Sequence, residues 1–296
     1  QLGALTATQV NALGATKIAD LATTQVTGLT STQIGGLSLA NLSALTGTQI
    51  GEMSETQIKG LTATQLKGMS ADDVGELTAD QLSALTATQV GSISTTALNA
   101  LDSTKMAAFN ETQVKGLTAT QLKAFTATEI GELANTQIQA LTATQIGALS
   151  SANVSELDFA DLSATQVKGL TATQVKDLSA TDIGELTTDQ LAALSTAQVA
   201  ALSATNVSEL DGTQVEALTT TQIKALTTTQ LKGLSTTDMG EFTATQIGAL
   251  SSTQLASLSA ENVSEIDFSD LNATQVKGLT TTQLSSLTET ALGNLS

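Results

Sequence analysis

The sequence predicts an all-α fold, an elongated solenoid of very short capped helices with one helix for each eight-residue repeat. Three features of this repeat support the prediction. A large apolar residue recurs every eight positions, a hydroxyl or short polar side chain follows it, and glutamine or a similar polar residue stands three positions further on. Self-similarity at a fixed period is typical of repeat proteins, in which each unit buries its apolar face only against its neighbours.

The octad reads Leu-Thr/Ser-x-x-Gln-Val/Ile/Leu-x-Gly/Ala and is established from Leu5 onward. Its two large apolar side chains contribute roughly 1.5–3 kcal/mol each when buried. Ordering the octad costs about 1.5 kcal/mol for each of its residues. One octad therefore does not fold alone, and stacking between octads must supply the difference.

Two five-residue slips interrupt this period. Residues 157–161 form a short unit after which Leu162 restarts the octads, and residues 266–270 repeat the slip before Leu271. We therefore treat residues 1–296 as a single continuous octad array with slips at 157–161 and 266–270. Because Gln1 stands in the middle of an octad and the chain stops soon after Leu295 opens another, we expect a segment of a longer array or a processed product.

The polar positions of the octad predict how each helix begins. With the leucine as position 1, position 2 is Ser, Thr, Asp or Asn in nearly every full octad, the exceptions being Gly14, Ala22 and Ala134. Position 5 is nearly always Gln, Asp, Glu or Asn. This spacing is that of a capping box, and the apolar residues at positions 1 and 6 have the spacing of a hydrophobic staple. Gly or Ala at position 8 lets the chain leave the helix and lets its neighbour approach closely.

One continuous helix is excluded by geometry, because eight residues at 100° each advance the pattern by about 80° and the leucines would spiral around the axis. We expect helices of about six residues, each about 9 Å long, joined by kinks at the Leu-Thr step. Such helices are marginal in isolation, so the rows of Leu and Val must hold them. The number of octads per turn and the handedness stay open.

A β-solenoid is the alternative fold, since Thr and Val favour strands and Thr-x-Thr occurs at Thr6 and Thr8. Apolar gaps of five and then three residues would place Leu and Val on opposite faces of a strand, whereas a solenoid wall has one inward face. The frequent Ala, Gln and Lys also favour helix.

The composition excludes several functions. The chain has no Cys, His, Trp, Tyr, Pro or Arg, so all its cations besides the N-terminus are lysines. Catalytic groups are reduced to carboxylates, lysine and hydroxyls, each in a repeat copied many times. A net charge of −17 argues against nucleic acid and anionic membranes. No apolar run approaches the length of a transmembrane span. We expect no enzyme activity, no catalytic or cofactor-binding residue, and no membrane insertion.

A longer repeat lies over the octads. The segment that begins at Met53 returns from Phe109, Leu162 and Leu218, and Leu271 opens a fifth copy, so that seven units make one super-repeat. It places paired lysines followed by a glutamate, at Lys59, Lys67, Lys115, Lys123, Lys168, Lys176, Lys224 and Lys232 and at Glu76, Glu132, Glu185 and Glu241. We interpret this charge pattern as a solvated face inherited by duplication, because exposed ion pairs contribute little. The alternative is a set of charge patches that meet complementary patches on another turn or another chain.

The slips are rich in carboxylates, which could hold a cation such as calcium. The acidic side chains are Glu156, Asp158, Asp161, Glu265, Asp267 and Asp270. Their spacing is not that of an EF-hand or of the Gly-rich calcium nonapeptide. We expect instead that Asp158 and Asp267 cap a helix and that Phe159 and Phe268 fill the gap left by three missing residues, with no metal site and no cofactor.

The octads of this chain, Leu-Thr-x-x-Gln-Val, resemble the octad-repeat tracts of large proteobacterial surface or secreted adhesin-like proteins. The resemblance covers the whole chain and implies an extracellular or cell-surface location and a role as stalk, fibre or matrix component. The expected function is that of a non-enzymatic spacer. Its expected partners are neighbouring repeats, other copies of the chain, and cell-surface or matrix components. The alternative is a binding module for glycan or ice with a regular face of threonine hydroxyls, which fails if the cap hydroxyls are bound to backbone amides.

Overall fold

The computed structural model describes residues 1–293, and all the regular structure there is helical, with no strand. The α-helices are four to six residues long and begin at intervals of one octad. The predicted all-α solenoid of short capped helices is therefore confirmed. The chain divides into two compact units, Gln1–Leu149 and Ser150–Ser296. The prediction of one continuous array across their boundary stays a prediction.

The first unit consists of one 3₁₀ turn and a series of short α-helices. In chain order they are η1 (Leu2–Ala4), α1 (Ala7–Asn11), α2 (Gly14–Ala19), α3 (Thr23–Val26), α4 (Ser31–Gly35), α5 (Leu39–Leu42), α6 (Gly47–Gly51), α7 (Glu55–Lys59), α8 (Ala63–Gly68), α9 (Ala71–Gly75), α10 (Ala79–Ala84), α11 (Ala87–Val90), α12 (Thr95–Leu98), α13 (Ser103–Ala107), α14 (Glu111–Lys115), α15 (Ala119–Ala124), α16 (Ala127–Gly131), α17 (Asn135–Ala140) and α18 (Ala143–Ala148).

The second unit has the same construction, with a 3₁₀ turn at each slip. In chain order its elements are α19 (Ser151–Val154), η2 (Phe159–Asp161), α20 (Ala164–Lys168), α21 (Ala172–Lys176), α22 (Ala180–Gly184), α23 (Thr188–Ala193), α24 (Thr196–Ala201), α25 (Ala204–Ser208), α26 (Gly212–Ala217), α27 (Thr220–Ala225), α28 (Thr228–Lys232), α29 (Thr236–Gly240), α30 (Ala244–Ala249), α31 (Ser252–Ser257), α32 (Ala260–Ser264), η3 (Phe268–Asp270), α33 (Ala273–Val276), α34 (Thr281–Ser285) and α35 (Glu289–Gly293).

Each typical helix begins at the predicted capping box. At α7, the Ser54 Oγ accepts from the Gln57 amide at 3.3 Å and the Gln57 Oε1 accepts from the Ser54 amide at 2.9 Å. Many helices end at the next leucine, whose extended backbone starts the following octad; Leu85 after α10 has φ −63° and ψ 146°. The kink at the Leu-Thr step is therefore found where the sequence predicts it.

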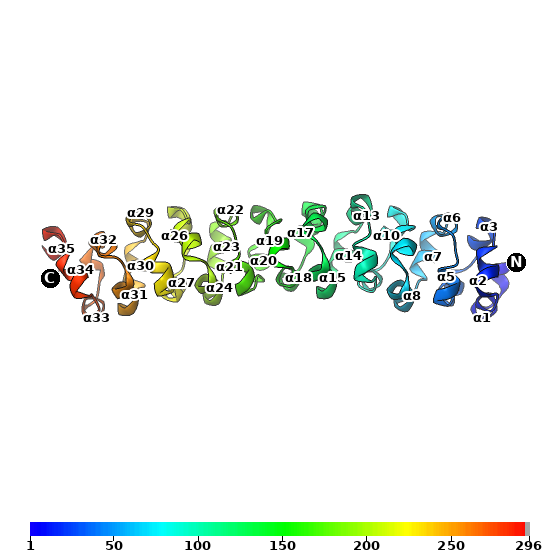
Figure 1. Ribbon diagram of the computed structural model, residues 1–296, viewed down its shortest axis with the longest axis horizontal. Coiled ribbons are helices and arrows are strands. Elements are labelled where there is room, and N and C mark those ends of the chain that lie inside the picture. Colours follow the sequence, from blue (N-terminus) through cyan, green and yellow to red (C-terminus); the bar gives the residue numbers. More distant parts are fainter. Residues whose placement is uncertain (294–296) are drawn as a thin grey trace. The chain divides into compact units, whose positions relative to one another are not determined.

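Three octads make one turn of the solenoid. Inside each unit, most helices pack against the helix three places further along, as α1, α4, α7 and α10 do in the first unit and α21, α24, α27 and α30 in the second. Figure 1 shows this coiling inside each unit, where helices return to the same side after every third one. The helices of a unit thus form three columns.

The two apolar residues of each octad line the interior of the coil. In the octad of α8, Leu61 at position 1 is 4% exposed and Leu66 at position 6 is fully buried. The same pair is buried in most other octads, so the hydrophobic staple and the core are made by the same side chains. The predicted rows of Leu and Val therefore hold the helices, as their short length requires.

Small residues at position 8 permit close stacking, as predicted. A Cβ added at Gly60 or Gly116 would overlap the backbone of Ser31 or Ala87, each at position 3 of the octad one turn earlier. These glycines are not needed for a left-handed backbone, however, since Gly60 and Gly116 have φ −74° and −79°. Where the helix ends at a leucine with extended backbone, the chain turns at that leucine and not at the residue before it. Position 8 is therefore small for packing alone.

The three octads without a polar cap behave in two ways. At Ala22 and Ala134 half of the capping box persists, because the Oε1 of Gln25 or Gln137 still accepts from the cap amide, at 2.8 and 2.9 Å. Gly14 instead adopts φ +79°, and α2 starts at Gly14 itself with no side-chain cap.

Candidate functional site

The most distinctive site of this protein is a repeated contact between turns, made by the glutamine at position 5. The Gln113 side chain is 1% exposed and uses both ends of its amide. Its Oε1 accepts from the Asn110 amide of its own helix cap at 2.9 Å. Its Nε2 donates to the carbonyls of Leu82 and Leu85 in the preceding turn, both at 2.7 Å, and approaches that of Ser83 at 3.2 Å. We call this arrangement the glutamine clamp.

The clamp recurs at a fixed spacing. The glutamine Nε2 donates to two carbonyls of the turn before, which belong to position 6 of one octad and position 1 of the next. Gln57 reaches Val26 and Leu29 in this way, both at 2.8 Å, and Gln222 reaches Leu191 and Leu194 at 2.7 and 2.8 Å. The carbonyls that receive these bonds lie where one helix ends and the chain turns. The position-6 carbonyl also accepts from the backbone amide of the next leucine, as Val26 does from Leu29 at 3.0 Å, so the clamp gives it a second donor.

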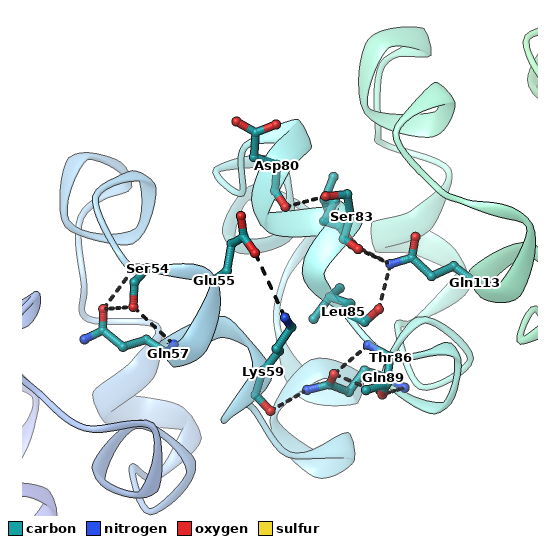
Figure 2. Close-up of polar contacts among 11 residues, drawn as sticks. Ser54, Glu55, Gln57, Lys59, Asp80, Ser83, Leu85, Thr86, Gln89 and Gln113 are labelled. Carbon is teal, nitrogen blue, oxygen red and sulfur yellow. Dashed lines mark hydrogen bonds and ion pairs between the residues drawn. The ribbon is translucent and has the colours of Figure 1, made fainter.

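Figure 2 shows two neighbouring clamps in the first unit. Gln113 points to the carbonyls of Ser83 and Leu85, and Gln89 points to the carbonyl of Lys59 at 3.1 Å while accepting from Thr86. Buried polar groups are costly unless they are paired, and each clamp pairs an amide side chain, a cap N–H and two carbonyls at once. The clamp therefore fixes both the start of one helix and its distance from the turn below.

Other residues at position 5 make different connections. Asn206 and Asn262 are one methylene shorter and each donates to one carbonyl, that of Leu178 or Leu234, at 2.9 Å. Lys105 donates its Nζ to the Gly75 carbonyl. The bonds between turns thus depend on which residue stands at position 5 of each octad.

At each slip the chain still completes a turn of three elements, but it does so with fewer residues. Phe159 is fully buried, and its carbonyl, with that of Leu162, receives the Gln190 clamp at 2.6 Å, as a position-6 residue would. After the second slip the Gln275 clamp reaches the carbonyls of Ile247 at 3.2 Å and Leu250 at 2.8 Å. The sequence distances from Gln275 to these two carbonyls are shorter than in an ordinary clamp, because the 3₁₀ turn η3 replaces one helix in between.

The expectation for the slip aspartates and phenylalanines is confirmed. Asp158 and Asp267 cap η2 and η3, accepting from the amides of Ala160 and Ser269, both at 2.9 Å. Phe268 is 3% exposed. Hydrogen bonds from Ser269 hold the pKa of the exposed Asp267 carboxyl below its ordinary value of 3.8. The Asp158 and Asp267 carboxylates therefore cap their own 3₁₀ turns.

The remaining acidic residues of the slips lie next to these caps. Asp161 and Asp270 end the 3₁₀ turns, while Glu156 and Glu265 precede them. Within residues 1–293, no three or more acidic side chains are grouped so that they could hold a metal ion.

The lysines do not connect turns through ion pairs in residues 1–293. Lys59 pairs with Glu55 at 4.0 Å and Lys105 with Asp102 at 3.8 Å, each inside one octad. The lysine pairs also move around the coil, since a super-repeat of seven octads is one octad longer than two full turns. In the first unit Lys59 and Lys67 belong to the octads of α7 and α8, and the next pair belongs to α14 and α15, so successive pairs lie one column apart.

The cap hydroxyls are engaged with the backbone. Thr118 Oγ1 accepts from the Gln121 amide at 3.3 Å and donates to the Gln121 Oε1 at 2.9 Å, and the Thr62 hydroxyl makes the same pair of contacts with Gln65. The glycan- or ice-binding alternative required these hydroxyls to be free. At position 2 that requirement is not met.

An open groove of about 620 Å³ in the first unit is lined mainly by small hydroxyl residues. Its walls come from α8, the α11–α12 connection and α15, and its only titratable group is Lys67. Sequence reasoning had named no residue here besides Lys67, and nothing in the octad pattern distinguishes the groove.

The fold and the clamp define the class of the molecule as an α-helical solenoid repeat protein. No protein-family model matches the chain, and no curated protein is significantly similar to it. Among the described residues, no helix is both long and apolar enough to cross a bilayer.

Proposed function

We propose that this protein is a non-enzymatic spacer, a stalk or fibre building block whose length is set by its number of octads. The observation that carries the proposal is the glutamine clamp, which recurs inside each unit and connects successive turns there by the same kind of bonds. Because these contacts involve only neighbouring turns, turns can be added or removed without redesign of the rest. A mechanical role needs this additivity and needs no cleft.

The charge of the chain supports the same role. With a net charge of −17 and a pI near 4.1, copies repel one another and stay dispersed. We further propose an extracellular or cell-surface location and an adhesin-like context, on the strength of the octad resemblance. The partners proposed are neighbouring repeats of a longer chain, other copies, and cell-surface or matrix components.

The test is to remove or duplicate one full turn, residues 61–84, and to measure the maximum dimension by small-angle X-ray scattering. Stacked helices lie about 8–10 Å apart, so the dimension should fall or rise by about that amount. Circular dichroism per residue should not change. As a control, removal of half an octad, residues 61–64, should disrupt the stacking. A dimension that does not follow the number of turns contradicts the proposal.

A further inference from the structure

An acid takes the place of the clamp glutamine at position 5 in a few octads, and two of these, residues 69–76 and 234–241, share an unusual geometry. We call these two the acidic octads. Asp73 and Asp238 stand at position 5, where a carboxylate cannot donate a hydrogen bond. Within the described chain, no side chain donates to the Leu45 or Leu210 carbonyl, which a glutamine there would reach. The donor comes instead from the preceding turn, where Ser43 Oγ donates to Asp73 at 2.8 Å and Ser208 Oγ to Asp238 at 2.5 Å.

Each acidic octad ends in a glutamate that lies against the helix one turn earlier. Glu76 lies over Gly47, the first residue of α6, so closely that a Cβ at Gly47 would be 2.8 Å from the Glu76 Oε1. Glu241 lies over Gly212, the first residue of α26, with its Cγ 3.6 Å from a Cβ placed there in the same way. The Glu241 Oε2 is buried and, within the described residues, has no hydrogen-bond partner.

The groups that surround Glu241 are acidic. Burial raises the pKa of Glu241 above 4.5, and the charges of Asp238 and Asp211 raise it further. Asp211 caps α26, accepting from the Gln214 amide at 2.8 Å. The other charged residues on the helices packed above and below are also acids, namely Glu216, Glu261 and Glu265.

The first unit has a related arrangement, in which the acids that raise the glutamate pKa lie on its own helix. Burial raises the pKa of Glu76 above 4.5, with further contributions from Asp73 and Asp72. The helix below, α6, is capped at its C-terminus by Glu52, and α12, which packs above α9, carries no charge. One cation is close by, since Lys105 of α13 donates to the Gly75 carbonyl beside Glu76.

We propose that the acidic octads are proton-sensitive contacts between turns, loosened by like charge at neutral pH and tightened when Glu76 and Glu241 take up a proton. A protonated glutamate loses its repulsion from the neighbouring aspartates and gains an O–H, a hydrogen-bond donor that the aspartate at position 5 does not supply. The equivalent glutamate in the third super-repeat shows the satisfied case. Glu185 Oε2 accepts from the Phe159 amide at 3.1 Å, so its carboxylate already has a donor.

The direction of the pH dependence follows from the raised pKa. Between 4.5 and the higher folded-state value, the folded chain holds protons that the unfolded chain has released. The stability of these contacts therefore falls as pH rises through that window. It is regained as pH falls back through the same window.

The experiment is hydrogen–deuterium exchange by mass spectrometry on the full chain at about pH 5 and about pH 7, corrected for intrinsic exchange. The variant is Glu76→Gln with Glu241→Gln, and the charge-matched control is Glu111→Gln with Glu289→Gln, two exposed glutamates. In the wild type and the control, protection of residues 42–47 and 207–212 should be lost on going from pH 5 to pH 7. In the glutamine variant that loss should disappear.

A second variant makes the test independent of the glutamates. Asp73→Gln with Asp238→Gln should restore two clamps and raise protection of the same segments at both pH values. The proposal is overturned if the Glu76/Glu241 variant keeps the wild-type pH response, or if the control loses it equally. It is also overturned if the restored clamps leave protection unchanged, because the missing donor would then not weaken these contacts.

Discussion

Replacing Gln113 by alanine should destabilise the turn below it far more than a lost helix cap would. The change removes an acceptor from the Asn110 amide and a donor from the Leu82 and Leu85 carbonyls. Each such bond contributes about 0.5–1.5 kcal/mol net, and an orphaned buried group costs about 1–3 kcal/mol. Because the site is only 1% exposed and three groups are affected, we expect a loss of about 2–4 kcal/mol.

Gln9→Ala is the matched control for this prediction. Gln9 accepts from the Thr6 amide at 2.9 Å, but it is exposed and, in the described chain, has no preceding turn to which its Nε2 donates. We expect a cost of about 0.5–1.5 kcal/mol for the cap alone. Urea unfolding followed by far-UV circular dichroism gives the totals, and hydrogen exchange of residues 80–90 locates the effect. Equal costs for the two variants would refute the clamp.

Gln113→Glu separates the two ends of the amide. The carboxylate keeps an acceptor for the Asn110 amide but has no donor for the carbonyls. At neutral pH it should be at least as destabilising as alanine. Below about pH 5 it should recover in part, because a protonated carboxyl donates again. A pH-independent cost would show that the inter-turn bonds contribute little.

Four further substitutions test the packing and the caps. Phe159→Ala should cost about 3–5 kcal/mol in urea unfolding, since the ring is fully buried in the slip. Gly116→Ala should cost about 1–3 kcal/mol because its Cβ would overlap the backbone one turn earlier, whereas Gly131→Ala, with open space around the Cβ, should be neutral or stabilising. Burial alone would raise the pKa of Asp238, but hydrogen bonds from Ser208 and Ser235 outweigh it and keep the pKa below 3.8. Its contribution is therefore complete above 3.8 and lost as pH falls through the folded pKa, and Ser208→Ala should move that loss to higher pH in acid unfolding curves.

The local structure could be predicted from the sequence because it depends on contacts inside one octad. The capping box joins Ser54 to Gln57 and the staple joins positions 1 and 6, so a single octad contains all the determinants of its helix. The slip was predictable for the same reason, since Asp158 caps its own turn and Phe159 is the large side chain that follows Leu157 in the five-residue unit.

The number of octads per turn and the glutamine clamp could not be predicted from the pattern inside one octad. The carbonyl partners of Gln113 belong to the preceding turn, and which residues they are depends on how many octads complete a turn. One signal was present in the sequence. Position 5 is glutamine far more often than glutamate, although a capping box accepts either, and among full octads only Glu129 is a glutamate there. The preference for glutamine indicates that this side chain is buried and that its Nε2 donates a hydrogen bond.

The most direct test of the central claim, three octads per turn joined at position 5, uses the absence of native cysteine. Spin labels on Thr64→Cys and Thr88→Cys, three octads apart at exposed position 4 of the stacked helices α8 and α11, should show strong dipolar broadening in continuous-wave electron paramagnetic resonance. Labels on Thr64→Cys and Asp80→Cys, which are closer in sequence at two octads apart but lie on different columns, should show much less. Stronger broadening at the two-octad spacing would contradict the three-octad turn and the clamp built on it.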